Sequence, residues 1–578
     1  MYEVGTGKAD ITAFKKDVGM MGYGMFHNRI TGVETPLMAR AFVIKDLTTK
    51  RKLVFVNAEI AFITISIKRG VMKKLKRHHA ELGFEADNVF LSAQHTHSGP
   101  GGYSHYGLYN ISTPGFVPEV YQTIVDGIVS TIVEADQNAQ PARISFTKGS
   151  FAPEIDVAFN RSVTAYNQNP EVKKLTEEEA NLAVDREMHL FRVDDMNGKP
   201  IGSFNFFGVH TTSVHNDNTK INADNKGYAA RLLEEEVSKE NPNYIAAFAQ
   251  KAAGDVTPNY VWDKKKHWTR GPLEDDIESA KYSGKLQYNK ALELHQQAAV
   301  NGETVQVGID FALSHANFAN IAPDLEFTNN NPDAKTFLSC HGVAFFKGTK
   351  EGPGMEPPLV AIATFATRIV KGYDHLRALF ISKSARNKIY EKYRIHGTKK
   401  ILIETGDRKV LGTRNITGLI VPAFIDPTIK YFKFFHKSGG LDHKPWTPQT
   451  LPLQLVVLGQ VAFVGIPGEI TTVAAQRLKR TVQDILSPRG VQEVIIVSYC
   501  NAYCGYITTF EEYQVQCYEG GHTPYGQWTL AAFQTKFKDL AQQLLKLPED
   551  RQIDTSINPV EFTEEELNKR IFAYSSRK

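Results

Sequence analysis

The sequence predicts one large mixed α/β domain in which β-sheets are flanked by helices, and two observations support this prediction. First, 42% of the 578 residues are hydrophobic and 22% are charged, which is typical of a folded globular chain and too apolar for a disordered one. Second, strand-like and helix-like segments alternate along the chain without a repeat or a low-complexity linker. Such alternation indicates α/β or α+β architecture rather than a string of modules.

The predicted strands are short runs rich in β-branched and aromatic residues, which suit a pleated and half-buried backbone. In chain order they are Ala41–Ile44, Leu53–Asn57, Asn88–Ser92, Met188–Val193, Ile201–His210, Ile245–Gln250, Leu359–Ala363 and Val494–Ser498. The predicted helices are longer segments whose apolar residues recur every three to four positions. They are Ile67–Leu82, Pro118–Ala135, Tyr228–Ser238, Asp276–Ala298, Thr471–Ile485 and Gly526–Leu545.

Charge and hydropathy argue against several classes of protein. The 67 Lys and Arg residues nearly balance the 63 Asp and Glu residues, for a net charge of +4 over the whole chain. A nucleic-acid partner is therefore not predicted, because it needs a concentrated basic stripe. The longest apolar run, Leu455–Ile466, is too short to span a bilayer and predicts buried strands instead. We predict no transmembrane segment, and no signal peptide in the chain as given.

The chain contains 18 histidines but only 4 cysteines, and imidazole is the commonest metal ligand in proteins. Three cysteines, Cys500, Cys504 and Cys517, lie close together, but their spacing does not match a zinc knuckle. We therefore predict that they are small buried hydrophobes. The histidine motifs are the better candidates for chemistry.

The first such motif is His95-Thr-His97, which follows a predicted strand and precedes Ser-Gly-Pro-Gly-Gly102. Residues two apart in an extended chain project to the same side, so the two rings should point together. The glycines that follow allow the backbone to approach a ligand closely. From the residues alone, a metal or catalytic pair and a pair of structural histidines both remain open.

Two further polar residues follow apolar strands. His210 ends the predicted strand Ile201–His210, whereas His215 lies in the polar loop beyond it, so His210 is the better ligand candidate. Glu469 follows Pro467 and Gly468, just before a predicted helix. Two roles for its carboxylate stay open. It complements the dipole of the helix that follows, or it is the anionic ligand in a zinc site with two histidines.

Eight motifs in a fixed order make the chain resemble the neutral/alkaline (non-lysosomal) ceramidase family. They are HTHSGPGG at His95, FNRS at Phe159, FGVHTTSV at Phe207, DNKGYAA at Asp224, FAQKAAGDVTPN at Phe248, GTKEGPG at Gly348, IPGEITT at Ile466 and YITTFEEYQVQCYEG at Tyr506. The resemblance implies one catalytic domain over residues 1–545 and a short C-terminal tail over 546–578. The immunoglobulin-like C-terminal domain of many family members is expected to be absent.

The resemblance also implies a function. Family members are zinc amidohydrolases that cleave the amide of ceramide into a fatty acid and a sphingoid base by means of a zinc-activated water. One Zn²⁺ per chain is expected, with ligands His95, His210, Glu469 and Tyr506. The expected catalytic residues are His97 beside the reacting amide, Arg161 as a substrate-positioning cation and Tyr518 as the hydroxyl that binds the oxyanion.

Two departures from the family pattern bear on the site and on the surface. Thr257 replaces the usual serine of GDVTPN; it is a possible nucleophile, but no adjacent base is evident in the sequence, and we favour activated water. A surface insertion at about 407–443 contains Lys430, Phe434 and Phe435. Lysines that alternate with aromatics suit a lid or a patch that contacts a lipid aggregate, and the alternative is an ordinary packed helix or hairpin.

The expected partner is a lipid substrate, ceramide or a related N-acyl lipid, with peripheral contact to a membrane. Two alternatives stay open: a deacylase of another N-acyl amphiphile, such as an N-acyl amino-acid lipid, and a catalytically weakened lipid-binding homologue. The resemblance favours a secreted, periplasmic or cell-surface protein, although the chain as given has no export signal.

Overall fold

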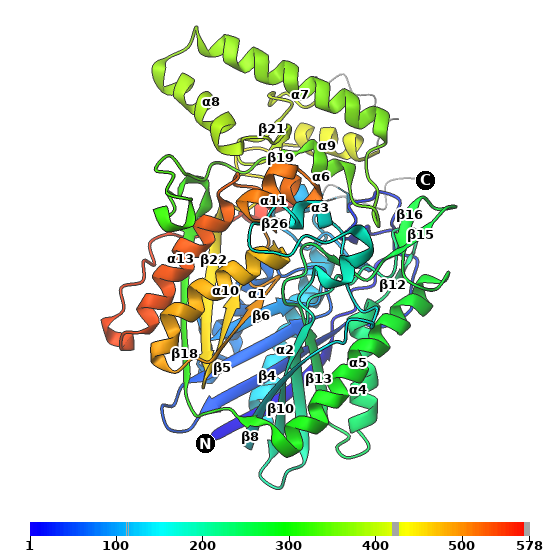
Figure 1. Ribbon diagram of the computed structural model, residues 1–578, viewed down its shortest axis with the longest axis vertical. Coiled ribbons are helices and arrows are strands. Elements are labelled where there is room, and N and C mark those ends of the chain that lie inside the picture. Colours follow the sequence, from blue (N-terminus) through cyan, green and yellow to red (C-terminus); the bar gives the residue numbers. More distant parts are fainter. Residues whose placement is uncertain (111, 114, 419–426, 572–578) are drawn as a thin grey trace.

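The computed structural model describes residues 1–578 except 111, 114, 419–426 and 572–578, and it leaves out the side chains of 427–431. Two β-sheets pack face to face in its centre, and helices cover their outer faces (Figure 1). The predicted mixed α/β fold is confirmed. Within the described residues no helix is both long and apolar enough to cross a bilayer.

The larger sheet is mainly antiparallel, with parallel pairs where β11 (Pro200–Phe206) meets β13 (Ile245–Ala249) and where β5 (Lys52–Ala58) meets β6 (Val89–Ala93). A short strand, β17 (Glu303–Thr304), pairs with one of its members, β8. The order across the sheet is β13 (Ile245–Ala249), β11 (Pro200–Phe206), β10 (Glu187–Asp195), β8 (Gln140–Ser150), β1 (Tyr2–Asp10), β4 (Met38–Asp46), β5 (Lys52–Ala58) and β6 (Val89–Ala93).

The second sheet has the order β18 (Ile309–Asn317), β22 (Thr450–Leu458), β23 (Val461–Gly465) and β25 (Glu493–Val497). Its inner face meets the larger sheet through aromatic side chains. The ring of Phe463 lies 5.5 Å from that of Phe191 and 5.4 Å from that of Phe206, centroid to centroid. Successive side chains point to opposite faces of a strand. The apolar side chains on the outer face of each sheet therefore pack against the helices.

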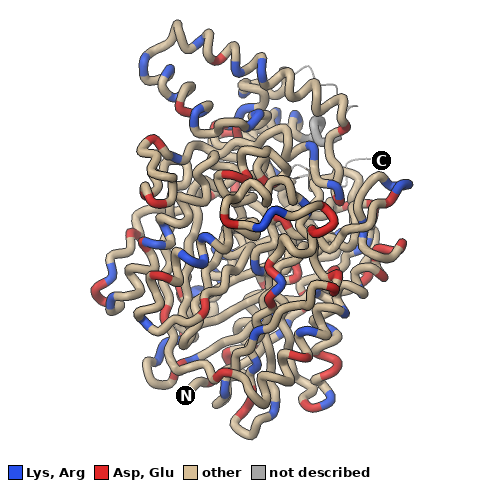
Figure 2. Tube along the Cα trace, viewed as in Figure 1, with Lys and Arg blue, Asp and Glu red and all other residues tan. Residues whose placement is uncertain are grey.

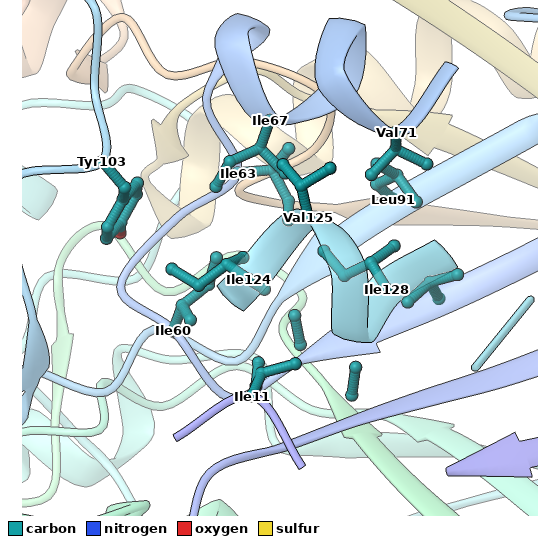
Figure 3. Close-up of a cluster of buried hydrophobic side chains, with 14 of the residues drawn as sticks. Ile11, Ile60, Ile63, Ile67, Val71, Leu91, Tyr103, Ile124, Val125 and Ile128 are labelled. Carbon is teal, nitrogen blue, oxygen red and sulfur yellow. The ribbon is translucent and has the colours of Figure 1, made fainter. Parts of the chain in front are cut away.

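Two helix pairs cover the outer face of the larger sheet, and a third pair covers the second sheet. Figure 3 shows the first interface, where Ile67 and Val71 of one helix and Ile124 and Ile128 of the next pack together with Ile11. Burying each such side chain contributes about 1.5–3 kcal/mol. The pairs are α1 (Ile65–His78) with α2 (Pro118–Gln137), α4 (Asp224–Val237) with α5 (Asp276–Asn301), and α10 (Thr472–Leu486) with α13 (Thr529–Leu544).

The prediction of a strand at Leu359–Ala363 was wrong. This segment lies in α7 (Pro357–Ala378), which forms a hairpin with α8 (Lys383–His396) at the top of Figure 1. Pro357 and Pro358 occupy the first helical positions, where the missing N–H has no cost. The local run of β-branched residues hid a longer helical period in the sequence.

The surface insertion contains α9 (Pro427–Lys437). The prediction that Phe435 belongs to an exposed patch was wrong, because Phe435 is only 4% exposed and packs with Phe432 and Trp446 in one apolar cluster. These two phenylalanines are three positions apart on the helix and so share its inward face. Phe434 is 47% exposed, and the side chain of Lys430 lies outside the described residues.

A buried ion cluster joins the larger sheet to α4. The Arg40 side chain, 2% exposed, contacts Glu59 at 2.7 Å (Nη1 to Oε1) and Glu234 at 2.7 Å (Nε to Oε1). Burial works to raise the pKa of the Glu234 carboxyl, but the Arg40 guanidinium holds it below its ordinary value. Arg40 thus pairs with both carboxylates in the interior, while two more exposed cations lie at the edge of the cluster: Arg231 contacts Glu59 at 3.3 Å and Lys8 contacts Glu234 at 3.1 Å.

Replacing Arg40 by Leu is expected to destabilise the protein by about 3–5 kcal/mol at neutral pH, because two buried carboxylates lose the buried cation that they share. Urea denaturation followed by circular dichroism measures this. The free-energy gap to wild type should narrow as pH falls from 7 toward 5, since the unpaired carboxyls then take up protons. Lys8→Ala is the matched control: Lys8 also contacts Glu234, but its side chain is 36% exposed, and we expect about 1 kcal/mol or less. An equal effect of the two substitutions would contradict the prediction.

Candidate active site and metal centre

The loops that follow four strands, two from each sheet, meet at one point. His95 lies two residues beyond β6, and His210 lies four residues beyond β11; a β-bridge between Thr96 and Thr211 joins their loops. Beyond strands β23 and β25 of the second sheet lie β24 (Glu469–Ile470) and β26 (Tyr506–Ile507), which pair in parallel as a separate two-stranded sheet. The structure thus brings together residues 411 positions apart in the chain.

The proton positions of two histidine rings are fixed by backbone carbonyls. Nδ1 of His95 lies 2.5 Å from the oxygen of Ala61, and Nδ1 of His210 lies 2.9 Å from that of Val256. A carbonyl oxygen can only accept, so each neutral ring carries its proton on Nδ1 and has a lone pair on Nε2. Burial lowers the pKa of His95 to about 4, which keeps that ring neutral at pH 7.

Both lone pairs point at one carboxylate. Oε2 of Glu469 lies 3.0 Å from Nε2 of His210 and 3.5 Å from Nε2 of His95. Burial works to raise the pKa of the Glu469 carboxyl, and a hydrogen bond donated by the Tyr503 hydroxyl lowers it by favouring the ionised form. The hydroxyl of Tyr506 completes the group at 3.4 Å from Nε2 of His210.

This donor set fits a bound cation. Two lone pairs and an anion converge on one point in a buried environment, which is unfavourable unless a positive charge lies between them. Neighbouring ligands of a tetrahedral zinc ion with bonds of about 2.0 Å are about 3.3 Å apart. The observed separations of 3.0, 3.4 and 3.5 Å between His210, His95, Glu469 and Tyr506 are close to this spacing.

His97 lies beside the same cluster. Its Nε2 is 2.9 Å from Nε2 of His95, and the donor atoms of His95, His97 and His210 all lie within 4.8 Å of one another. Because His95 presents a lone pair, this contact is a hydrogen bond only when His97 carries its proton on Nε2. Nδ1 of His97 is then a buried acceptor, and it has no hydrogen-bond partner among the described residues.

Arg161 lies behind Tyr506 and is held by two carboxylates. It contacts Glu351 at 2.6 Å (Nη1 to Oε1) and Glu519 at 2.8 Å (Nε to Oε1). Its Nη2 donates to the hydroxyl of Tyr506 and to the carbonyl of Gly254, both at 2.8 Å. Burial works to raise the pKa of Tyr506, and the nearby guanidinium opposes this by favouring the phenolate.

A family model described as "Neutral/alkaline non-lysosomal ceramidase, N-terminal" matches residues 2–416 and 434–535. The chain belongs to this family. It is 32% identical over 551 residues to a neutral ceramidase of Pseudomonas aeruginosa, covering 94% of this chain and 72% of that one. Neutral ceramidase A of Dictyostelium discoideum is 34% identical over 575 residues, covering 94% and 73%.

Solved ceramidase structures agree with the sequence matches. The crystal structure of the neutral ceramidase from Pseudomonas aeruginosa superposes with a TM-score of 0.76 at 31% identity and covers 97% of this chain and 76% of that one. A ceramidase complexed with C2 gives a TM-score of 0.78 at 32% identity, covering 97% and 77%. The predicted family is thus confirmed, and the family model leaves residues 417–433 of the surface insertion unmatched.

Two details of the sequence prediction for this ceramidase-family site were wrong. The strand expected to end at His210 is β11, which ends at Phe206. His95 and His97 do not project from extended backbone, because His95 has a φ of 81°. A positive φ is uncommon for a residue other than glycine, and such strain concentrates at functional sites.

Thr257 is engaged by a residue that the sequence did not connect to it. Its hydroxyl donates to Oε2 of Glu351, and the same oxygen accepts from Thr212 at 3.0 Å and from Asn259 at 3.1 Å. The other oxygen of Glu351 binds Arg161. Thr257 therefore belongs to the network that fixes the guanidinium, which supports the preference against a threonine nucleophile.

Sequence reasoning missed several residues that contact the site. Glu351 and Glu519 hold Arg161, while the hydroxyls of Tyr499 and Tyr503 donate to Glu469. Tyr23 packs edge-on against His97, with ring centroids 4.8 Å apart. The density of tyrosines between residues 499 and 519 was a visible signal, whereas nothing in the local sequence points to Tyr23.

Another group with metal-like spacing is an ion-pair network. Donor atoms of Glu187, His189 and Glu493 lie within 4.8 Å of one another. However, Lys148 contacts Glu493 at 2.6 Å, and Lys479 contacts it as well. Because two lysines already neutralise this carboxylate, the group serves to join the two sheets by ion pairs.

Metal titration tests the ligand set without any substrate. Chelator-treated protein should bind one equivalent of Zn²⁺ in calorimetry, and His95→Ala and Glu469→Gln should each weaken binding on the order of 10²-fold or more. His97→Ala should weaken it less, by about tenfold, which is the lower end of the effect expected for a residue that contacts a ligand. His215→Ala is the control, because His215 is equally buried but binds Asp276 instead. Full zinc affinity in His95→Ala would contradict the assignment.

Proposed function

We propose that this ceramidase-family hydrolase uses one bound zinc ion to cleave the N-acyl amide of ceramide into a fatty acid and a sphingoid base. The observation that carries the proposal is the convergence of two histidine lone pairs and a buried carboxylate at tetrahedral spacing. The names of the relatives supply the substrate, because ceramidases match almost the whole chain.

The ligands for the ion would be His95, His210, Glu469 and Tyr506. When bound, zinc supplies a Lewis acid that polarises an amide carbonyl and lowers the pKa of water to about 7. The ligand set keeps this centre stable because each histidine is held by a backbone carbonyl. Tyr499 and Tyr503 orient the carboxylate of Glu469 by hydrogen bonds.

Proton transfer falls to His97 in this proposal. Its ring has one nitrogen directed at His95 and a second, buried nitrogen without a partner among the described residues. Burial lowers the pKa of His97 well below its ordinary value, so the ring is neutral and able to accept a proton. It would take the proton released by the attacking water and pass it to the departing amine.

Two further residues, Tyr518 and Arg161, would act around the carbonyl oxygen of the reacting amide. Tyr518 stacks edge-on against Tyr506, with centroids 5.3 Å apart, and we assign its hydroxyl to the developing oxyanion. Arg161 acts as a positioning residue: its donors already hold Glu351, Glu519 and the hydroxyl of Tyr506. It keeps Tyr506 in place and offsets part of the rise that burial causes in the pKa of that phenol.

Incubation with a panel of N-acyl lipids tests the substrate. We expect fatty-acid release from ceramide in the zinc-loaded enzyme and near-background release from His95→Ala, while His215→Ala keeps wild-type activity. Faster release from an N-acyl amino-acid lipid than from ceramide would favour the alternative deacylase. Binding of these lipids without release of any fatty acid would identify a lipid-binding homologue.

Replacing Tyr518 by Phe removes only a hydroxyl, and it should lower turnover about 10²–10³-fold with zinc content unchanged. Single-turnover release of fatty acid measures the chemical step, and metal analysis of the same sample checks the site. Thr257→Ser serves as the comparison, because it keeps the hydrogen bond to Glu351 and should stay within a few-fold of wild type. Unchanged turnover in Tyr518→Phe would remove this residue from the mechanism.

A further inference from the structure

The outer face of α7 carries an exposed apolar stripe. Large hydrophobic side chains recur there every three to four residues, which places them on one side of a helix with 3.6 residues per turn. A contiguous patch of this kind is unusual on a soluble protein and marks an interaction site. The stripe consists of Ile362, Phe365, Ile369, Tyr373 and Leu376, together with Phe380 in the turn just beyond the helix, and these residues are 57–82% exposed.

The opposite face of α7 packs against the rest of the protein, so the apolar stripe faces away from it. Thr367, Asp374 and Ala378 are the buried residues of this helix. The carboxylate of Asp374 contacts Lys392 of α8 at 2.9 Å, and Lys392 also contacts Glu404 of β20 (Ile401–Glu404) at 3.1 Å. This ion cluster holds both helices of the hairpin to the body of the protein.

The hairpin is also strongly basic. Residues 357–396 contain eight Lys and Arg residues but only two acidic ones, a net charge of +6 where the whole chain has +4. Both acidic residues are paired, Asp374 with Lys392 and Glu391 with Lys335 at 2.9 Å. Figure 2 shows the hairpin at the top with blue segments predominating over red ones.

Short links connect this hairpin to the proposed active site. Glu351, which holds Arg161 and Thr257, lies six residues before the start of α7. On the other side, Tyr23 touches His97, and nearby Phe26 packs against the apolar cluster that also contacts Val360 of α7. An external surface bound by α7 would therefore lie near the proposed active site.

We propose that the outer face of α7 docks onto an anionic lipid bilayer, with its apolar side chains in the interface and the basic residues of the hairpin on the headgroups. This inference rests on the proposed function, since ceramide is a lipid that resides in membranes. An amphipathic helix with a large apolar face and flanking Lys and Arg residues is the kind that lies in a membrane surface.

Charge selects this occupant over a second copy of the chain. Dimerisation through the stripe would bring together two hairpins that each carry a net charge of +6, and like charges at an interface are unfavourable. An anionic bilayer offers both an apolar layer and the opposite charge. Long Lys and Arg side chains reach headgroups while their stems stay on apolar surface.

Flotation with lipid vesicles tests the proposal without substrate. Wild-type protein should float with phosphatidylcholine vesicles that contain a quarter phosphatidylglycerol, and added salt should weaken this binding because it screens the charges. The triple variant Phe365→Gln, Ile369→Gln and Leu376→Gln should bind about 100-fold more weakly. Glutamine is a good helix former, and the three positions are exposed, so the fold should be kept.

Two comparison variants separate the physical contributions. Val300→Gln with Leu547→Gln removes apolar residues that are 80% and 63% exposed but lie outside the hairpin; this control should bind like wild type. Lys383→Glu with Lys388→Glu keeps the stripe and should weaken binding about tenfold or more to anionic vesicles. Binding by the triple variant equal to that of wild type would overturn the proposal. The proposal would also be overturned if the wild-type protein formed a dimer and did not bind vesicles, and if the triple variant were a monomer.

Activity measurements separate this proposal from the proposed function. The triple variant should hydrolyse a soluble short-chain N-acyl substrate at the wild-type rate, but should release fatty acid from vesicle-embedded ceramide about tenfold or more slowly. Wild-type protein that floats with vesicles yet hydrolyses neither substrate would overturn the function and support the docking. Normal hydrolysis of both substrates by the triple variant would overturn the docking alone.

Discussion

Two backbone carbonyl oxygens determine the chemistry of the site. Ala61 and Val256 accept the Nδ1 protons of His95 and His210, and this leaves both Nε2 lone pairs directed at Glu469. If either ring held its proton on Nε2 instead, it would simply hydrogen-bond to the carboxylate, and the cluster would be satisfied without a cation. The loops that carry these carbonyls thus decide whether the buried residues act as ligands or as ordinary hydrogen-bonding partners.

The carboxylates beside the proposed ligands are stabilised by one cation from the protein. Arg161 lies between Glu351 and Glu519, and all three side chains are buried. Removing the guanidinium would leave two carboxylates unpaired in a medium of low dielectric, at a cost of several kcal/mol. The network that holds Arg161 therefore stabilises the fold and at the same time positions the hydroxyl of Tyr506.

Much of the fold was predictable, because a helix that is buried on one face has apolar residues every three to four positions in the sequence. The helices α1, α2, α5 and α10 were predicted within a few residues of their ends, whereas α7 was missed because its exposed face is also apolar.

The core of the site was predictable from the sequence, because its polar residues follow predicted apolar strands. Its supporting network was not, since Arg161 is 190 positions from Glu351 and 358 from Glu519, and the positive φ of His95 depends on tertiary packing rather than on local sequence.

The proposed ligand set draws on both layers of the sandwich. His95 and His210 follow strands of the larger sheet, whereas Glu469 and Tyr506 follow strands of the second sheet. An ion bound by all four would act as a cross-link between the sheets, and its binding free energy would add to the free energy of unfolding of the whole domain. Stability and metal supply would then be thermodynamically linked, so a shortage of metal would loosen the sandwich itself as well as stop the reaction.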